Sequence, residues 1–207
     1  MREQLISSLE NSFSYQEYMD LLEDLVTSES TTGEITQERI DFTALNFKRS
    51  QRLNKKLQLS ELQTAPFTEL ETKQTWLVLT ESWCGDAAQT LPVLNKLAEA
   101  SENIELRIIL RDENPAVMDN FLTNGTRSIP KMVILDTDLE VLTNWGPRTA
   151  AATKLVTDYK EKFGKIDAEF KSQLQIWYNK DKGMSIIQEL TEIVATLKNR
   201  EAGVLQG

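Results

Sequence analysis

The residue best suited to chemistry is Cys84, the only cysteine in the 207-residue chain. It lies in the segment ESWCGDA, residues 81–87, where an apolar run meets a helical pattern. A thiol at a helix N-terminus faces unpaired N–H groups and the positive end of the helix dipole, which favour the attacking thiolate. The carboxylates of Glu81 and Asp86 oppose this effect. We therefore expect a thiol pKa below the ordinary value of about 8.5, but less depressed than in a dithiol enzyme.

Other kinds of catalytic and metal site have little support. A lone cysteine cannot form an internal disulfide, so any disulfide must join another molecule. The chain has no histidine, which excludes Ser-His and Cys-His pairs and zinc sites that depend on imidazole. No glycine-rich phosphate loop occurs, and the DTDLE segment at 136–140 lacks the glycine and distal glutamate of a calcium loop. We expect neither a metal site nor a nucleotide site.

The charge of the chain restricts its partners. Asp and Glu number 32 against 23 Lys and Arg, giving a net charge of −9, which repels nucleic acid and anionic lipid. The N-terminal segment has no signal-peptide pattern, and no stretch approaches the roughly 18 apolar residues of a membrane span. We expect a cytoplasmic protein that binds neither nucleic acid nor membrane, and the oligomeric state stays open.

Helices are expected before the cysteine. A capping-box pair, Ser14 and Glu17, begins an amphipathic helix, and a longer helix is expected over 36–59. A second such pair, Thr68 and Glu71, predicts a short helix or turn. These elements precede the first expected strand.

The elements that must position Cys84 alternate between strands and helices. They are a strand over 75–80, a helix after Cys84 that Pro92 should kink, a strand over 103–110, a helix over 115–123, strands over 131–136 and 139–145, and a helix over 148–163. The first strand, helix and second strand form a right-handed βαβ unit, and the last two strands form a hairpin. Further helical patterns follow to the C-terminus.

Several motifs occur in the order found in thioredoxins. Trp83, Cys84 and Gly85 precede a helix, Pro92 follows nine residues after Trp83, and Ile129-Pro130 and Gly146 come later. The chain thus resembles the thioredoxin family, and more narrowly a bacterial group that reads WCGDA and carries an N-terminal helical extension. The resemblance implies an α/β thioredoxin-like fold, with a central mixed sheet, flanking helices and additional N- and C-terminal helices. The implied parts are an N-terminal extension (1–74), a core (75–163) and a C-terminal extension (164–207).

The sequence departs from the family pattern where the chemistry is done. Asp86 and Ala87 replace the proline and the second cysteine, so no cysteine in the chain can expel a mixed disulfide. Val78 stands where thioredoxins have a buried aspartate. No clear first strand precedes residue 75, so we expect the sheet edge to be open or covered by the N-terminal helices.

Two functions follow from the resemblance. In the first, Cys84 attacks a disulfide-containing protein or a low-molecular-weight thiol adduct, and an external thiol such as glutathione resolves it, without another cofactor. The residues expected to shape this site are Trp83, Gly85, Asp86, Ile129, Pro130 and Gly146. In the alternative, Cys84 is a packing residue in a redox-silent binding module, and the groove beside Pro130 holds a peptide or protein partner.

Two basic features each have two possible interpretations. Arg148 either reaches an anionic group near Cys84 or is a simple surface arginine. A basic stripe occupies one face of the helix expected over 36–59, and is either a solvated face that pairs with local glutamates or a docking surface for an anion. Its members are Lys48, Arg49, Arg52, Lys55 and Lys56.

Overall fold

A mixed β-sheet forms the centre of the protein. The computed structural model describes residues 1–204, with side chains to residue 200, and in this part the sheet has four strands. They are β1 (Gln74–Thr80), β2 (Ile104–Leu110), β3 (Lys131–Leu135) and β4 (Val141–Trp145). The strand order is β2-β1-β3-β4; β1 and β2 are parallel, and the other two pairs are antiparallel. The predicted βαβ unit and hairpin are confirmed.

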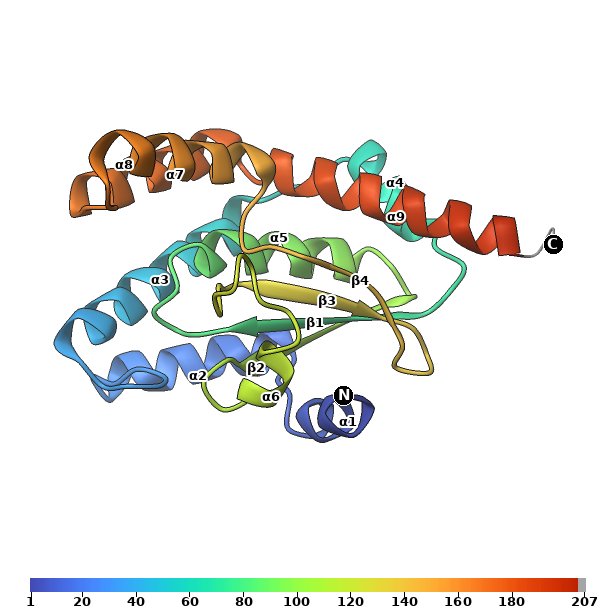
Figure 1. The fold of residues 1–207 in the computed structure, drawn as a ribbon, viewed down its shortest axis with the longest axis horizontal. Coiled ribbons are helices and arrows are strands. Elements are labelled where there is room, and N and C mark those ends of the chain that lie inside the picture. The colour runs from blue at the N-terminus through green and yellow to red at the C-terminus, as the bar shows by residue number, and fades with distance from the viewer. Residues whose placement is uncertain (205–207) are drawn as a thin grey trace.

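Helices cover both faces of the sheet (Figure 1). They are α1 (Arg2–Glu10), α2 (Tyr15–Thr27), α3 (Gln37–Lys56), α4 (Glu61–Thr68), α5 (Ala87–Glu99), α6 (Pro115–Met118), α7 (Ala150–Phe163), α8 (Ala168–Asp181) and α9 (Met184–Val204). Helix α5 lies on one face with α9 above it, while α1, α2 and α6 lie on the other. The fold is therefore α/β, as predicted.

The central strand β1 is deeply buried, which stabilises the sheet. Four successive residues of β1, from Trp76 to Leu79, are completely buried. An uninterrupted apolar run is expected for a strand that is covered on both faces. Val78, the residue found in place of the family's aspartate, is one of these four and lies in the apolar core.

The edge of β2 is partly covered by the N-terminal segment. Phe13 exchanges two backbone hydrogen bonds of 2.8 Å with Ile108, and α1 and α2 contact β2. This single antiparallel bridge stands where the sequence shows no first strand. Of the two expected alternatives, an open or a covered edge, the structure shows cover by the N-terminal segment.

The helix predictions succeed where the cap is unambiguous. Helix α2 begins after Ser14, whose hydroxyl accepts from Glu17 N–H, while the Glu17 carboxylate accepts from Ser14 N–H at 2.7 Å. The prediction at Thr68 and Glu71 is wrong, because Thr68 is the last residue of α4. That helix begins instead after Ser60, whose backbone N–H donates to the Gln63 side chain at 2.8 Å. The helix expected over 115–123 also ends early, at Met118.

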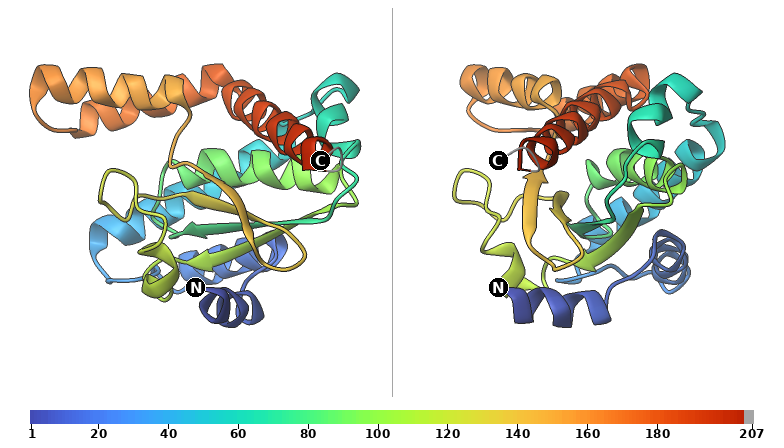
Figure 2. Two further views of the ribbon diagram at one scale, coloured as in Figure 1. Left: turned by 45° about the vertical axis from the view of Figure 1, so that its right-hand side comes forward. Right: turned by 90° about the vertical axis from the view of Figure 1, so that its right-hand side faces the viewer.

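The α7–α8 hairpin has a hydrophobic cluster separate from the main core. Its buried residues are Ala152, Val156, Phe170, Leu174 and Tyr178. Figures 1 and 2 show the hairpin projecting beyond the end of the sheet. The predicted boundary between core and C-terminal extension falls at Gly164, directly after α7, and the last three positions of that extension, 205–207, lie outside the described residues. The division into three parts remains a prediction.

No helix among the described residues is long and apolar enough to cross a membrane.

Candidate functional site

The loop between β1 and α5 places Cys84 at the start of a helix. The Cys84 N–H donates to the Glu81 carbonyl oxygen at 3.1 Å, and the Cys84 carbonyl oxygen accepts from Ala88 N–H at 3.2 Å. Asp86 is the N-cap of α5. The strand-to-helix position predicted for Cys84 is therefore observed.

The cysteine lies against the Ile129-Pro130 peptide. The Cys84 S–H donates to the Ile129 carbonyl oxygen, 3.4 Å away, and the Ile129-Pro130 bond is cis. Gly146 packs on the other side of Pro130: a Cβ atom at this position would lie 2.4 Å from the Pro130 carbonyl oxygen, and φ is +105°. Only glycine fits such a contact with this backbone conformation. These candidate residues, far apart in sequence, are thus adjacent in the structure.

The Cys84 thiol is nevertheless buried, with 7% of the residue exposed. Burial, followed by the charge of Asp86, raises its pKa to about 12. The backbone N–H groups of Ala87 and Asp86 and the charge of Arg148 act in the opposite direction but do not prevail. The predicted depression of this pKa is therefore wrong, because desolvation outweighs the helix N-terminus.

Helix α8 covers the loop that carries the cysteine. Tyr178 donates its hydroxyl hydrogen to Asp86 Oδ1 at 2.9 Å, and the Gln175 side chain donates to the Gly85 carbonyl oxygen at 3.3 Å. Arg148 Nη2 lies 2.6 Å from Asp86 Oδ2. Arg148 therefore reaches an anionic group near Cys84, which resolves its two interpretations. Sequence reasoning missed Tyr178 and Gln175, which belong to an ordinary amphipathic helix and carry no distinguishing motif.

Trp83 is the most accessible large side chain of the motif. It is half-buried, and the guanidinium carbons of Arg39 and Arg111 lie 4.7 Å and 5.1 Å from its ring centroid. Its indole N–H is buried and has no hydrogen-bond partner among the described residues. Cations near an aromatic face are attracted by its negative charge distribution, so the two arginines hold the ring in place. Neither arginine was predicted as a site residue.

A cluster of hydroxyl groups attaches the α2–α3 loop to the motif. Ser82 Oγ lies 2.8 Å from Thr43 Oγ1 and 3.1 Å from both Thr31 Oγ1 and Thr32 Oγ1. Asn46 donates to the Ser82 carbonyl oxygen at 3.1 Å. The cysteine loop is therefore held by the N-terminal helices as well as by α8.

Glu81 is a completely buried acid beside the motif. One carboxylate oxygen accepts from Asp112 N–H at 2.8 Å, and the other has no partner among the described residues. Burial raises the pKa of Glu81. The Glu81 carboxylate lies beside Asp112, and only the backbone carbonyl of Glu81 accepts a hydrogen bond from Cys84.

The basic stripe on α3 divides into two parts. Lys48, Lys55 and Lys56 are exposed, while Arg49 and Arg52 are half-buried. Arg49 donates to Asn46, and Arg52 donates to Asn179 of α8. No carboxylate in residues 1–200 lies within 4.0 Å of a stripe cation, so the expected pairing with local glutamates is not found.

The described residues hold no group of three or more Cys, Asp or Glu side chains that could bind a metal ion. Apart from Cys84, the polar and aromatic side chains at the motif are the Trp83 indole, the guanidinium groups of Arg39, Arg111 and Arg148, and the carboxylates of Glu81 and Asp86.

Comparisons with known proteins agree with this geometry. A family model described as Thioredoxin matches residues 33–160, more than half of the chain. The protein PA1234 from Pseudomonas aeruginosa, whose crystal structure is described as that of a protein of unknown function, has a TM-score of 0.58 at 21% identity. That match covers 89% of this chain and 98% of the other. An HIV epitope scaffold matches with a TM-score of 0.57 at 20% identity, covering 89% and 99%.

No curated protein matches the chain. The structural matches, at such low identity, show a shared fold, and the family model adds the sequence evidence. The chain belongs to the thioredoxin family.

Proposed function

We propose that the protein is a redox-silent thioredoxin-fold binding module, which holds an extended peptide or protein partner in the groove beside Pro130. The observation that carries the proposal is the state of the Cys84 thiol. It is buried, its S–H is engaged by the Ile129 carbonyl oxygen, and its pKa is raised to about 12. At pH 7 such a thiol is ionised in only about one molecule in 10⁵, and the thiolate is the attacking species.

Groups of the motif and beside Pro130 support binding rather than exchange. Trp83 offers a half-exposed aromatic surface beside Arg111, and Gly146 leaves the backbone next to Pro130 free of a side chain. Ile129 and Pro130 are buried, and the Ile129 backbone N–H has no hydrogen-bond partner among the described residues. An extended peptide can pair with such a backbone group while a side chain packs on an aromatic surface.

The two parts of the proposal are tested separately. An array of immobilised peptides is first probed with the labelled protein, and the peptides that bind are then measured by calorimetry. Cys84→Ala should bind as the parent does, whereas Trp83→Ala should bind at least about tenfold more weakly, because it removes a large contact surface. Phe163→Ala is the matched control, since Phe163 is exposed on α7, away from the motif. Loss of binding in Cys84→Ala with retention in Trp83→Ala would refute the proposal.

A second candidate function is monothiol exchange, favoured by the position of Cys84 opposite Ile129 at the start of α5. The Cys84 thiolate would attack the glutathione sulfur of a mixed disulfide, forming a Cys84–glutathione disulfide and releasing the substrate thiolate. A second glutathione thiolate would then attack this disulfide, releasing oxidised glutathione and restoring Cys84. This function requires the buried thiol to become accessible. Turnover of a glutathione mixed disulfide that disappears in Cys84→Ser would support it over the binding module.

A further inference from the structure

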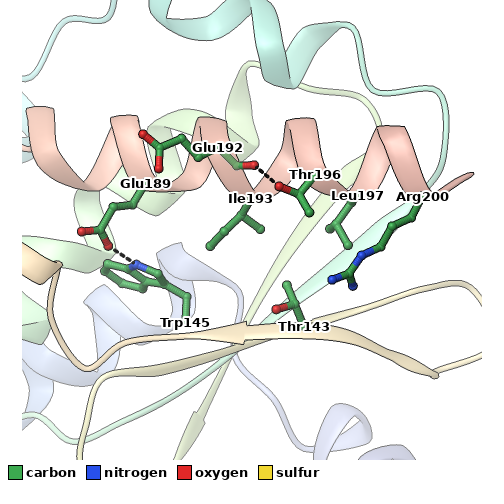
Figure 3. Close-up of a pocket in the computed structure, with 8 residues that line it drawn as sticks. All are labelled: Thr143, Trp145, Glu189, Glu192, Ile193, Thr196, Leu197 and Arg200. Atoms are coloured by element: carbon green, nitrogen blue, oxygen red, sulfur yellow. Dashed lines mark hydrogen bonds between the residues drawn. The ribbon is translucent and has the colours of Figure 1, made fainter. Parts of the chain in front are cut away.

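A second surface with the features of a binding site lies between β4 and α9, and Cys84 is not among the residues that line it. A pocket of about 270 Å³ lies there. Figure 3 shows Thr143 and Trp145 of β4 on one side of it and Ile193, Leu197 and Arg200 of α9 on the other. None of these residues belongs to the groove beside Pro130. What the pocket does is therefore a separate question from the proposed function.

The end of the pocket at Trp145, a residue only 8% exposed, is rigid, and Glu189 and Glu192 line the pocket together with the apolar side chains. The Trp145 indole N–H donates to Glu189 Oε2 at 2.7 Å, and Glu189 Oε1 accepts from Ala150 N–H at 2.6 Å. Both carboxylate oxygens are thus engaged, so Glu189 fixes the ring instead of offering a charge to a ligand. Ile193 extends the apolar surface beside the ring. This end suits an aromatic or aliphatic group.

The opposite end carries a positive charge. In Figure 3 the Arg200 guanidinium lies over Thr143, at the far end of the pocket from Trp145. Arg200 makes no ion pair with a carboxylate among the residues whose side chains are described. An arginine is well suited to bind a carboxylate in a two-pronged contact. This end therefore suits an acidic group.

The strand below the pocket is an edge strand. Within the described residues, β4 pairs with β3 on one side and with no strand on the other. Its residues 141–144 are all at least partly exposed. In an antiparallel pair, alternate residues of the edge strand direct their backbone N–H and C=O groups outward, where they can pair with an added strand.

We infer that β4 and the pocket together form a docking site for an extended peptide, which adds to the sheet beside β4. Thr143 and Trp145 are two residues apart on the same face of the strand, and an added strand has the same two-residue period. An apolar side chain over Trp145 would therefore be separated by one residue from an acidic side chain beneath Arg200. The volume suits one or two side chains better than a drug-sized ligand, for which pockets of roughly 300–1,000 Å³ are usual.

The probes are two fluorescein-labelled peptides, Ser-Thr-Phe-Thr-Glu-Thr-Ser and its reverse, since an added strand can run in either direction. One of them should bind saturably in fluorescence polarisation and shift the backbone amide NMR signals of residues 141–145. Replacing its Glu by Gln should weaken binding by about tenfold, because a charge-assisted contact is lost. Arg200→Gln should weaken the Glu peptide equally but should not weaken the Gln peptide further.

Two control variants show whether the peptide binds at this surface or elsewhere on the protein. Lys180→Gln removes an exposed charge on α8 and should leave the affinity unchanged. Trp83→Ala should also leave it unchanged, which makes failure here distinguishable from failure of the proposed function. The inference is overturned if neither peptide binds up to about 1 mM, a limit that corresponds to weak association. It is equally overturned if binding is insensitive to Arg200→Gln or if the shifted signals lie outside β4 and α9.

Discussion

The N-terminus of α5 and the sheet edge at β4 differ in what they offer to other molecules. At the N-terminus of α5, the one thiol of the chain is buried, and α8 is anchored beside it on Asp86 and Gly85. At β4, the edge of the sheet and the pocket under α9 are open, but they carry no nucleophile. The potentially reactive group is therefore inaccessible, and the accessible surface is suited to recognition. The C-terminal helices contribute to both conditions. Helix α8 packs beside the cysteine loop, and α9 leaves a pocket next to β4.

Gly146 directly follows β4 and contacts Pro130 beside Cys84, so it connects the two regions. Its substitution should have the largest effect on stability. A Cβ atom would meet the Pro130 carbonyl oxygen at 2.4 Å in a backbone with φ of +105°. Gly146→Ala should destabilise the fold by about 3 kcal/mol or more, because neither the strain nor the backbone clash can be relieved locally. Gly125→Ala is the control, since φ is +73° there but nothing lies within 4 Å, and it should cost about 1 kcal/mol. Equal losses of thermal stability in the two variants would show that the close contact is not needed.

The closed region should open when its central carboxylate is removed. Asp86→Ala leaves Arg148 and Tyr178 without their shared partner and should cost about 2 kcal/mol of unfolding free energy. After burial, the Asp86 charge is the main factor that raises the Cys84 pKa, so its removal should lower that pKa. Alkylation of Cys84 at pH 8 should then be about tenfold faster than in the parent.

Asp158→Ala provides the contrast for that experiment. Asp158 forms an exposed ion pair with Lys154 on α7, so its loss should change stability by less than about 0.5 kcal/mol. If Asp86→Ala alkylates no faster than Asp158→Ala, then Asp86 does not help to close the site.

A smaller effect is expected from one hydrogen bond of the cover. Tyr178→Phe removes the 2.9 Å bond to Asp86 while keeping the ring in the α7–α8 cluster. It should cost about 1 kcal/mol and make Cys84 alkylation a few-fold faster, because α8 is held less firmly. Tyr159→Phe removes a comparable bond to Asp167 within the hairpin and should leave the alkylation rate unchanged. Equal rates in the two tyrosine variants would mean that α8 does not limit access.

The smallest effect on stability is expected from Glu81, the buried acid beside the cysteine motif. Burial raises the Glu81 pKa in the folded state, so the folded protein binds this proton more tightly than the unfolded chain does. The contribution of Glu81 to stability is therefore fully present below the unfolded pKa and is lost as the pH rises through the folded pKa. Glu81→Gln should raise the melting temperature slightly at pH 7, and the gain should shrink towards pH 4. A gain that grows on acidification would contradict this sign.

Much of the core was predictable because its signals are local. The apolar run at 75–80 and the WCG motif before a helical pattern place β1, the cysteine loop and α5, and Ile129-Pro130 and Gly146 follow in family order. It was less predictable which residue caps the start of a helix, because Ser60 and not Thr68 is the N-cap of α4.

The state of the thiol could not be read from the sequence. It depends on contacts between residues about 90 positions apart, such as Tyr178 with Asp86 and Gln175 with Gly85. The helical pattern of residues 168–181 shows an amphipathic helix but does not show what it packs against. The sign of the Cys84 pKa shift depends on how deeply the folded chain buries the thiol, because burial outweighs the helix N-terminus.

The most direct measurement is the pH dependence of Cys84 alkylation in the native protein. The rate with iodoacetamide, followed by mass spectrometry from pH 7 to 10, should rise throughout this range without a plateau. At pH 8 it should be about 10³-fold slower than in the denatured chain, where the thiol has its ordinary pKa. A plateau with a midpoint at or below about 8.5 would show an accessible thiolate and would contradict the proposed redox-silent function.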